Sequence, residues 1–199
     1  MGSLFGIISE ELPKHTVLSR TASYEIRCYA ERWVASTPTS SLARGGGGDD
    51  DGGAFRRLAS YIGVISTPLN ESKTPIAMTS PVLTGPASSL FGGGSKDDGC
   101  VMNFVLPSSL KEPPKATGPN MTIRQLPASV FAASRFSGVA TVQMLAKQEQ
   151  LLREALLRDG VKVGEGAKAV LARYNPPWTP APLRTNEVLL PVDFVAARV

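Results

Sequence analysis

Residues 25–36 read EIRCYAERWVAS, and residues 122–133 read TIRQLPASVFAA. Both stretches mix apolar and polar residues at alternating positions and carry β-branched or aromatic side chains, which predicts two short strands around a turn in each. Two dipeptides of the first stretch match two of the second at one offset of 97 residues: Ile26-Arg27 with Ile123-Arg124, and Val34-Ala35 with Phe131-Ala132. We therefore predict that the chain contains an internal repeat.

The repeat continues beyond these strands. The same offset relates AFRRLASYIG at 54–63 to QLLREALLRDG at 150–160, and both carry apolar residues at helical spacing. A proline-containing segment and a further strand follow each helix, and the strands at 101–107 and 186–192 share a VLP or LLP pattern at an offset of 84. Each half is expected to fold as strand–strand–helix–strand–strand, over about 17–107 and about 115–193.

Two such halves predict about eight strands and two helices in a single domain that spans residues 1–199. The second helix is expected over about 141–159, with Gly160 placed to end it. A sheet of this size tends to curl or close, with the helices against its outside or its ends. The predicted fold class is α+β: a distorted antiparallel or mixed β-barrel with two flanking helices, built from two pseudo-symmetric ββαββ repeats.

Two glycine-rich stretches, RGGGGDDDGG at 44–53 and FGGGSKDDG at 91–99, interrupt these patterns. Neither has the GxxxxGK[ST] spacing of a phosphate-binding loop, and neither has the alternating aspartates of a calcium-binding loop. Their composition is typical of flexible surface connections. We therefore expect flexible loops at both places.

Composition places the chain among folded globular proteins. The formal net charge is +4, no run of five or six Lys and Arg occurs, and the two cysteines form no CxxC pair. These features argue against a nucleic-acid-coating protein and against a disulfide framework. No apolar run approaches the length of a membrane span, and the first residues lack the pattern of a secretory signal. The expected location is the cytoplasm.

Six segments occur in order and at fitting distances: SYEIRCYAERWVAST at 23–37, RLASYIG at 57–63, PIAMTSPV at 75–82, NFVLP at 103–107, YNPPW at 174–178 and RTNEVLL at 184–190. Together they resemble the SOUL / heme-binding protein family, over about residues 17–193. The resemblance implies a distorted barrel with two flanking helices that binds heme or a related tetrapyrrole in a shallow apolar groove. It places that groove along residues 54–63 and 174–184.

A heme site needs apolar surface, cations for the two propionates and, in some proteins, an axial ligand to the iron. The resemblance points to these residues for the apolar surface: Phe55, Leu58, Tyr61, Met78, Val82 and Trp178. The candidate cations are Arg56, Arg57 and Arg184, because a guanidinium group can pair with a carboxylate through two hydrogen bonds. A simpler interpretation stays open for each, since apolar helical stripes usually pack into a core and arginines are often solvated.

Cys28 is the candidate axial ligand. One branch of the family has a histidine at this position, within EIRHY, and a cysteine thiolate is itself a heme ligand. The opposing interpretation is a small side chain packed within the sheet. His15 is expected at the surface, and Glu187 is expected to be a buried acid with a structural hydrogen-bonding role.

The first functional hypothesis is a binding protein, a carrier or buffer of heme b or another tetrapyrrole, rather than an enzyme. Two alternatives stay open. One is an enzyme that acts on bound heme by peroxide-dependent ring opening or by iron removal, and the other is an interaction protein that docks through the helix LLREALLRDG at 151–160. The expected partners are heme or porphyrin and, for heme delivery, another protein. No nucleic acid is expected as a partner, and the chain is expected to be a monomer or a weak dimer.

Overall fold

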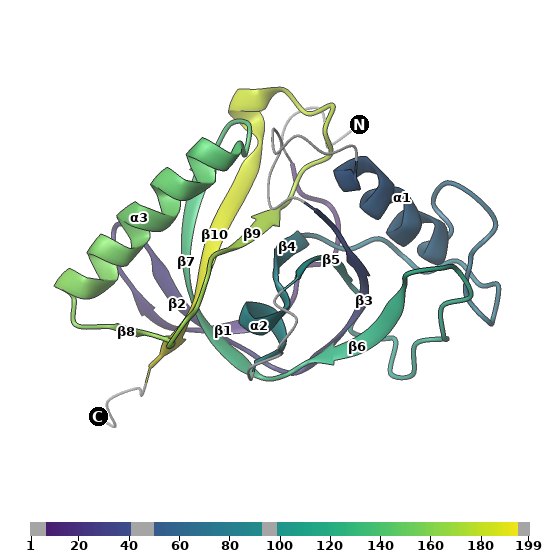
Figure 1. The fold of residues 1–199 in the computed structure, drawn as a ribbon, viewed down its shortest axis with the longest axis horizontal. Coiled ribbons are helices and arrows are strands. Elements are labelled where there is room, and N and C mark those ends of the chain that lie inside the picture. Colours follow the sequence, from purple (N-terminus) through teal and green to yellow (C-terminus); the bar gives the residue numbers. More distant parts are fainter. Residues whose placement is uncertain (1–6, 41–49, 93–98, 195–199) are drawn as a thin grey trace.

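A computed structural model describes residues 7–40, 50–92 and 99–194 of the chain, apart from the side chains of Asp50 and Asp51. Within these residues the chain forms ten strands and three α-helices (Figure 1). The strands are β1 (His15–Arg20), β2 (Glu25–Tyr29), β3 (Arg32–Pro38), β4 (Val82–Pro86), β5 (Cys100–Val105), β6 (Thr122–Leu126), β7 (Ser129–Ser137), β8 (Lys162–Val163), β9 (Val170–Arg173) and β10 (Thr185–Asp193). The helices are α1 (Asp50–Ile62), α2 (Ala87–Phe91) and α3 (Val142–Arg158), and a short 3₁₀ helix spans Ala181–Leu183.

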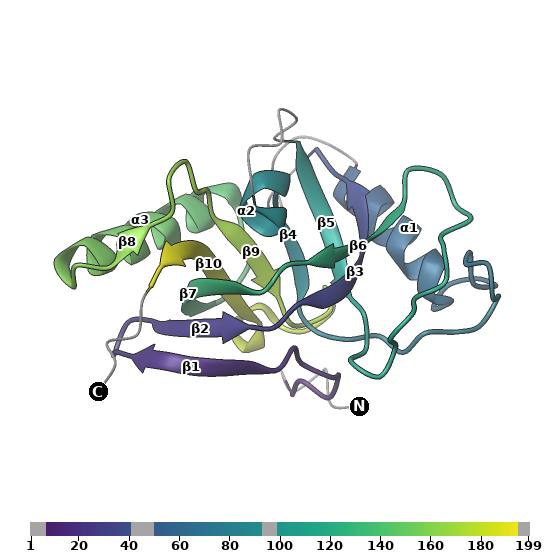
Figure 2. The ribbon, with the colours of Figure 1, turned by 90° about the horizontal axis from the view of Figure 1, so that it is seen from below.

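The strands form one antiparallel sheet that curls into a half-barrel (Figure 1, Figure 2). Nine of them follow the order β1-β2-β7-β10-β9-β4-β5-β3-β6, and β8 pairs with β10. Among the described residues β1 and β6 lie at the two ends of this order and do not pair, so the barrel stays open. The predicted α+β class and curled sheet are confirmed. The expected numbers of strands and helices are too low, because β1 and β8 lie outside the repeat pattern and α2 is too short to show a helical period.

The two stretches that match in sequence are partners in the sheet. β2 pairs with β7 and β3 pairs with β6, and the two residue numbers of every pair sum to 158, as for Ile26 opposite Ala132. The four strands therefore form one long ladder in a single register. The ladder is interrupted at 30–31 and 127–128, where Pro127 has no N–H to donate. The expected turn is thus a bend within one long strand.

The register of this ladder agrees with the predicted offset, because a shift of 97 residues maps the β2–β7 pairs onto the β6–β3 pairs. The agreement ends at the next strands. Val34 lies opposite Val105, and the offsets of 97 and 84 would place Phe131 opposite Leu189. Instead, Phe131 lies opposite Pro191, two residues further along. The repeat over the full halves of the chain stays a prediction.

Alternate residues along each strand face opposite sides of the curled sheet, so buried side chains gather on both. Phe131 and Leu189 point into the concave side, where α2 packs through Leu90. Their neighbours Ala132 and Leu190 point outward, under α3. A further cluster lies under α1, which packs on β3 and β5 on the other outer flank. The two long helices thus cover two flanks of the outer surface.

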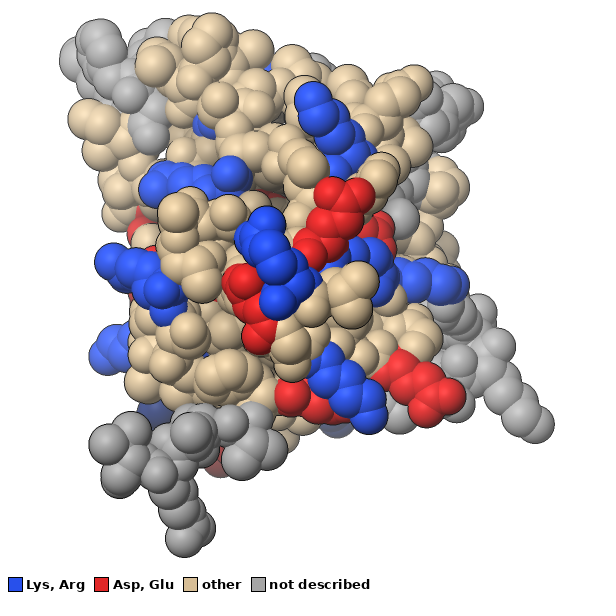
Figure 3. Space-filling model, turned by 90° about the vertical axis from the view of Figure 1, so that its left-hand side faces the viewer, with Lys and Arg blue, Asp and Glu red and all other residues tan. Residues whose placement is uncertain are grey.

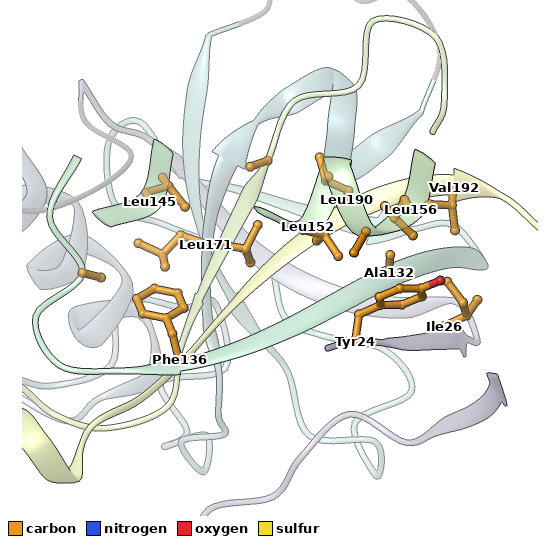
Figure 4. Packing of buried hydrophobic residues seen from close by; sticks show 14 residues of the cluster. Tyr24, Ile26, Ala132, Phe136, Leu145, Leu152, Leu156, Leu171, Leu190 and Val192 are labelled. Carbon is orange, nitrogen blue, oxygen red and sulfur yellow. The ribbon is translucent and has the colours of Figure 1, made fainter. Parts of the chain in front are cut away.

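α3 covers its flank with the apolar stripe that the sequence predicts. The hydroxyl oxygen of Thr141 caps the helix by accepting a hydrogen bond from the Met144 N–H at 3.1 Å. The observed bounds, Val142–Arg158, agree with the predicted span. Leu145, Leu152 and Leu156 of the stripe lie against the sheet (Figure 4). Ala155 is a further buried residue of the helix in the same cluster.

α1 begins earlier than the sequence predicts, at Asp50 rather than near residue 54. Gly52 and Gly53 have low helix propensity, yet they lie in the first turn, because tertiary packing overrides a weak local preference. The flexible loop expected at 44–53 therefore overlaps the helix. The rest of that stretch, 44–49, lies outside the described residues, as does 93–98 in the second glycine-rich stretch.

Candidate functional site

A surface groove runs along α1 on the outer side of the half-barrel. Its volume is about 230 Å³, which is below the roughly 300–1,000 Å³ of typical ligand pockets. A ligand larger than this would extend past the groove onto the surface. The lining combines apolar and cationic side chains with glycines: Gly53, Arg56, Arg57, Ser60, Tyr61, Leu69, Gly118, Pro119 and Met121.

Hydrogen bonds tie the two walls of the groove together. Arg57 of α1 donates from Nε to Thr37 Oγ1 at 2.8 Å and from Nη2 to the Pro38 carbonyl oxygen at 2.8 Å. Thr37 donates its own hydroxyl proton to the Asn120 carbonyl oxygen at 2.7 Å. These bonds join α1, β3 and the segment before β6.

Tyr61 closes the base of the groove. Its side chain is fully buried, and its hydroxyl donates to the Pro114 carbonyl oxygen at 2.8 Å. Burial raises the pKa of Tyr61 to about 12, so the phenol stays protonated and is a poor iron ligand. Met121 is another lining residue of a type that binds heme iron in other proteins. The lining therefore offers apolar surface and two cations to an apolar ring with anionic substituents, and Met121 is its candidate side chain for contact with an iron.

The other residues predicted on α1 face different environments. Arg56 is exposed at the groove, and Arg57 is half-buried there. Leu58 is fully buried in the cluster under α1 and does not line the groove. Phe55 is half-buried, with its ring edge-on to Phe104 at 5.3 Å between centroids. The structure thus places two of these four side chains at the groove, and their part in ligand binding stays a prediction.

The loop at 174–184 contributes no residue to the lining of the groove. Trp178 on this loop is 68% exposed. Arg184 donates from Nε to the Thr179 carbonyl oxygen at 2.7 Å and from Nη2 to the Pro177 carbonyl oxygen. Arg184 therefore fastens the backbone of its own loop, an interaction that the sequence does not reveal.

Three further predicted residues lie away from the groove. Met78 is half-buried against the cluster under α1, and Val82 is a buried member of it. Cys28 is half-buried on β2, between Thr16 of β1 and Val130 of β7. Since Val130 packs against the cluster under α3, Cys28 belongs to the α3 flank. The groove belongs to the α1 flank.

A buried ion pair lies on the inner face of the sheet. Glu187 of β10 is only 4% exposed and accepts hydrogen bonds from Arg27 Nη1 and Nη2 at 2.8 and 2.9 Å. The Tyr174 hydroxyl donates to the same carboxylate at 2.5 Å, and burial together with this carboxylate raises the pKa of Tyr174 well above its usual value. Arg27 Nε also donates to Glu25 at 2.8 Å. The prediction that Glu187 is a buried, hydrogen-bonded acid is confirmed.

The outward side of α3 is mostly polar. Figure 3 shows basic and acidic side chains interspersed on this flank, and Arg153 pairs with Glu149 one turn earlier at 2.7 Å. Leu151 and Leu157 are exposed large apolar residues there. Docking of a partner through α3 stays a prediction, because the main apolar stripe of the helix packs on the sheet.

Two features are absent from the described part of the chain. No group of three or more His, Cys, Asp and Glu side chains in it could hold a metal ion. Its helices include none that is long and apolar enough to cross a membrane.

The sequence alone did not identify Leu69 or 118–121 as parts of the groove. Gly63 ends α1 with φ +83°, and a Cβ at this position would lie 2.5 Å from Pro68 Cγ. The chain can therefore turn back along the helix, and the Leu69 N–H donates to the Ser60 carbonyl oxygen at 2.9 Å. The dipeptide Gly118-Pro119 predicts a turn, but nothing in the sequence indicates that this turn lines the groove.

The curled sheet, the outer helices and the cationic groove define a small α+β protein with a surface groove along one helix. A family model described as SOUL heme-binding protein matches residues 10–191. The chain belongs to the SOUL heme-binding protein family.

Solved structures of similar fold come from proteins with different descriptions. A crystal structure of a hydrolase encoded by lin2189 from Listeria innocua has 10% identity and a TM-score of 0.57, covering 88% of this chain and 94% of that chain. The crystal structure of the EcmrR C-terminal domain has 11% identity and a TM-score of 0.54, covering 93% of this chain and all of the other. At such identities the likeness shows the fold alone. No curated protein matches the sequence.

Proposed function

We propose that this protein binds heme, or another tetrapyrrole with carboxylate substituents, along the α1 groove and acts as a carrier or buffer of it. Family membership points to heme. One observation in the groove carries the proposal: Arg56 and Arg57 stand beside an apolar lining that includes Leu69 and Met121. The ring would rest on the apolar side chains while the guanidinium groups pair with the propionates.

The two arginines are suited to different tasks. Arg57 is fixed by its hydrogen bonds to Thr37 and Pro38, so it offers a preset positive charge. Arg56 is exposed and can move to meet a propionate. Phe55, Leu58 and Met78 would act indirectly, by supporting α1 from below. Trp178 and Arg184 would contact only the part of a ring that extends past the groove.

Hemin titration of matched variants tests this proposal. Arg56→Gln should weaken hemin binding by roughly tenfold, since a hydrogen bond to a charged group contributes about 1.5–3 kcal/mol. Arg158→Gln makes the same change of charge at an exposed arginine on α3 and should leave the affinity unaltered. Soret absorbance and tryptophan quenching both report the binding. Equal affinities of the two variants would place the ligand elsewhere.

A carrier and an enzyme differ in what happens to the ligand. With a carrier or buffer, hemin bound to excess protein should keep its Soret spectrum for hours and be recovered intact. Adding peroxide should then destroy bound hemin no faster than free hemin. Faster loss with a defined product would favour ring opening, and release of free porphyrin would favour iron removal.

A further inference from the structure

A second, smaller cavity opens on the inner side of the half-barrel, on the opposite face of the sheet from α1. Its volume is about 30 Å³, which is room for one small polar group. Most of its walls are apolar, and its polar atoms come from a few residues. The walls include Leu12, Leu83 and Leu189, and the polar residues include Tyr29, Arg32 and Tyr174.

Arg32 is the only residue of this lining with a buried polar atom that lacks a partner among the described residues. Its Nε is buried and makes no hydrogen bond. Its Nη1 donates to the Ala30 carbonyl oxygen at 3.1 Å, and the guanidinium carbon lies 4.8 Å from the centre of the Tyr29 ring. No acidic side chain of the described chain forms an ion pair with it. Buried polar groups are nearly always hydrogen-bonded, so an unpaired Nε in a cavity points to a missing acceptor.

Two acidic groups of the inner face, Glu187 and Glu25, are already paired with Arg27. Glu187 accepts two hydrogen bonds from Arg27 and one from Tyr174. Glu25 accepts one from Arg27 and forms an ion pair with Arg20 at 2.8 Å. Arg27 therefore pairs with two carboxylates, whereas Arg32 pairs with none among the described residues.

The acid–base behaviour of the two arginines agrees with this geometry. Burial acts to lower the pKa of both side chains. For Arg27, burial is the largest single effect, but the hydrogen bonds to Glu187, Tyr29 and Glu25 and the charge of Glu187 together outweigh it and raise the pKa. For Arg32, burial prevails and the pKa is lowered, because only a charge interaction with Tyr29 opposes it. An anion placed at Arg32 would stabilise its charged form.

We propose that this inner cavity is a second binding site, separate from the α1 groove, for a small carboxylate with an apolar or aromatic body. The carboxylate accepts hydrogen bonds from Arg32 Nε and an Nη, in the two-point geometry that guanidinium favours. The apolar body packs against the Leu12 and Leu83 side of the cavity mouth. His15 also lines the cavity, with its ring 5.1 Å from that of Tyr29, and it carries no negative charge in any protonation state.

Amide chemical shifts during titration test the proposal in the natural protein. Benzoate serves as the probe, and benzyl alcohol is a neutral molecule of similar shape. Benzoate should shift the amides around Arg32, Leu12 and Tyr174 in a saturable way, and benzyl alcohol should bind at least tenfold more weakly. Equal affinities, or benzoate shifts confined to the residues of the α1 groove, would overturn the proposal.

Two variants of equal charge assign the effect to Arg32. Arg32→Gln should weaken benzoate binding at least tenfold while hemin affinity stays unchanged. Arg124→Gln removes another arginine that stacks on an aromatic ring, with its guanidinium 3.7 Å from the Phe91 centroid, and should leave benzoate binding intact. Retention of benzoate binding in Arg32→Gln would refute the site. If that variant does not fold, the comparison of benzoate with benzyl alcohol in the natural protein decides the question.

Discussion

Cys28 shows how the environment of one side chain limits its chemistry. The residue is half-buried on β2, on the flank that α3 covers, and its cross-strand neighbours are Thr16 and Val130. The α1 groove lies on the other flank. Ligation of a heme iron in that groove by this thiol would require a large rearrangement of the sheet, so packing is the better account of Cys28.

Cys28→Ala is therefore expected to leave the hemin affinity within twofold of the natural value and the Soret band unshifted. The variant should lose about 1 kcal/mol of unfolding free energy, a typical value for a point substitution, because a partly buried sulfur is removed. Urea unfolding and hemin titration measure the two effects. Cys100→Ala, at the start of β5, is the matched control. A Soret shift in Cys28→Ala alone would restore the thiol as an iron ligand.

Single residues also show what the sequence could predict. Leu58 and Tyr61 both belong to the apolar stripe of α1, and both are fully buried. Only Tyr61 reaches the groove, because the segment at 118–121 passes over that part of the helix. The stripe is visible in the sequence. The boundary between core and groove is not, since it depends on a segment more than fifty residues away along the chain.

At the scale of secondary structure, a side-chain contact joins the end of α3 to the sheet. The Tyr24 hydroxyl, just before β2, donates to Asp159 Oδ2 at 2.7 Å, just after α3. Tyr24 also packs with the cluster under α3 (Figure 4). Burial and, to a smaller extent, the hydrogen bond to Asp159 raise the pKa of Tyr24 from 10.0 to about 12.

This contact predicts a stability change at alkaline pH. In the unfolded chain the phenol loses its proton near pH 10, whereas in the folded protein it keeps the proton until about pH 12. The contribution of Tyr24 is therefore complete below pH 10 and is lost as the pH rises to about 12. Tyr24→Phe should unfold at lower urea concentration at pH 8, by roughly 1 kcal/mol for the lost hydrogen bond. Its stability should fall less steeply between pH 8 and 11. Parallel declines in the two proteins would contradict this prediction.

The elements differ in how far the sequence predicts them. α3 was predicted nearly to the residue, because its stripe and its Thr141 cap are local signals. The start of α1 was missed because Gly52 and Gly53 argue against a helix until packing is considered. α2, with five residues, has no period to detect. The loop at 174–184 was recognised, but the hydrogen bonds from Arg184 to its own backbone were not.

At the scale of the whole molecule, the two predicted halves of the chain are interleaved in one sheet. β2 pairs with β7, β3 pairs with β6, and β4 pairs with β9. Each of these pairs joins the first half of the chain to the second. Separation of the halves would expose three sets of unpaired strand edges and divide the inner cluster.

Expression of residues 1–115 and 116–199 as separate chains tests this interdependence. Neither piece should show a cooperative unfolding transition in urea, and both should bind a dye for exposed apolar surface. If the two pieces associate when they are mixed, some cooperative unfolding should return. Independent cooperative transitions of both pieces would show that each half is a folding unit, against the topology of the sheet.

The ion pair on the inner face has a consequence for synthesis of the chain on the ribosome. Arg27 and Glu187 are 160 residues apart, and ribosomes add about 5–20 residues per second. At those rates, roughly 8–30 s pass between the synthesis of Arg27 and the synthesis of Glu187. A chain released early, before residue 187, would have to bury Arg27 without its main carboxylate, which is strongly unfavourable. Incomplete products should consequently stay open to proteases, while only a finished chain can close its interior around the pair.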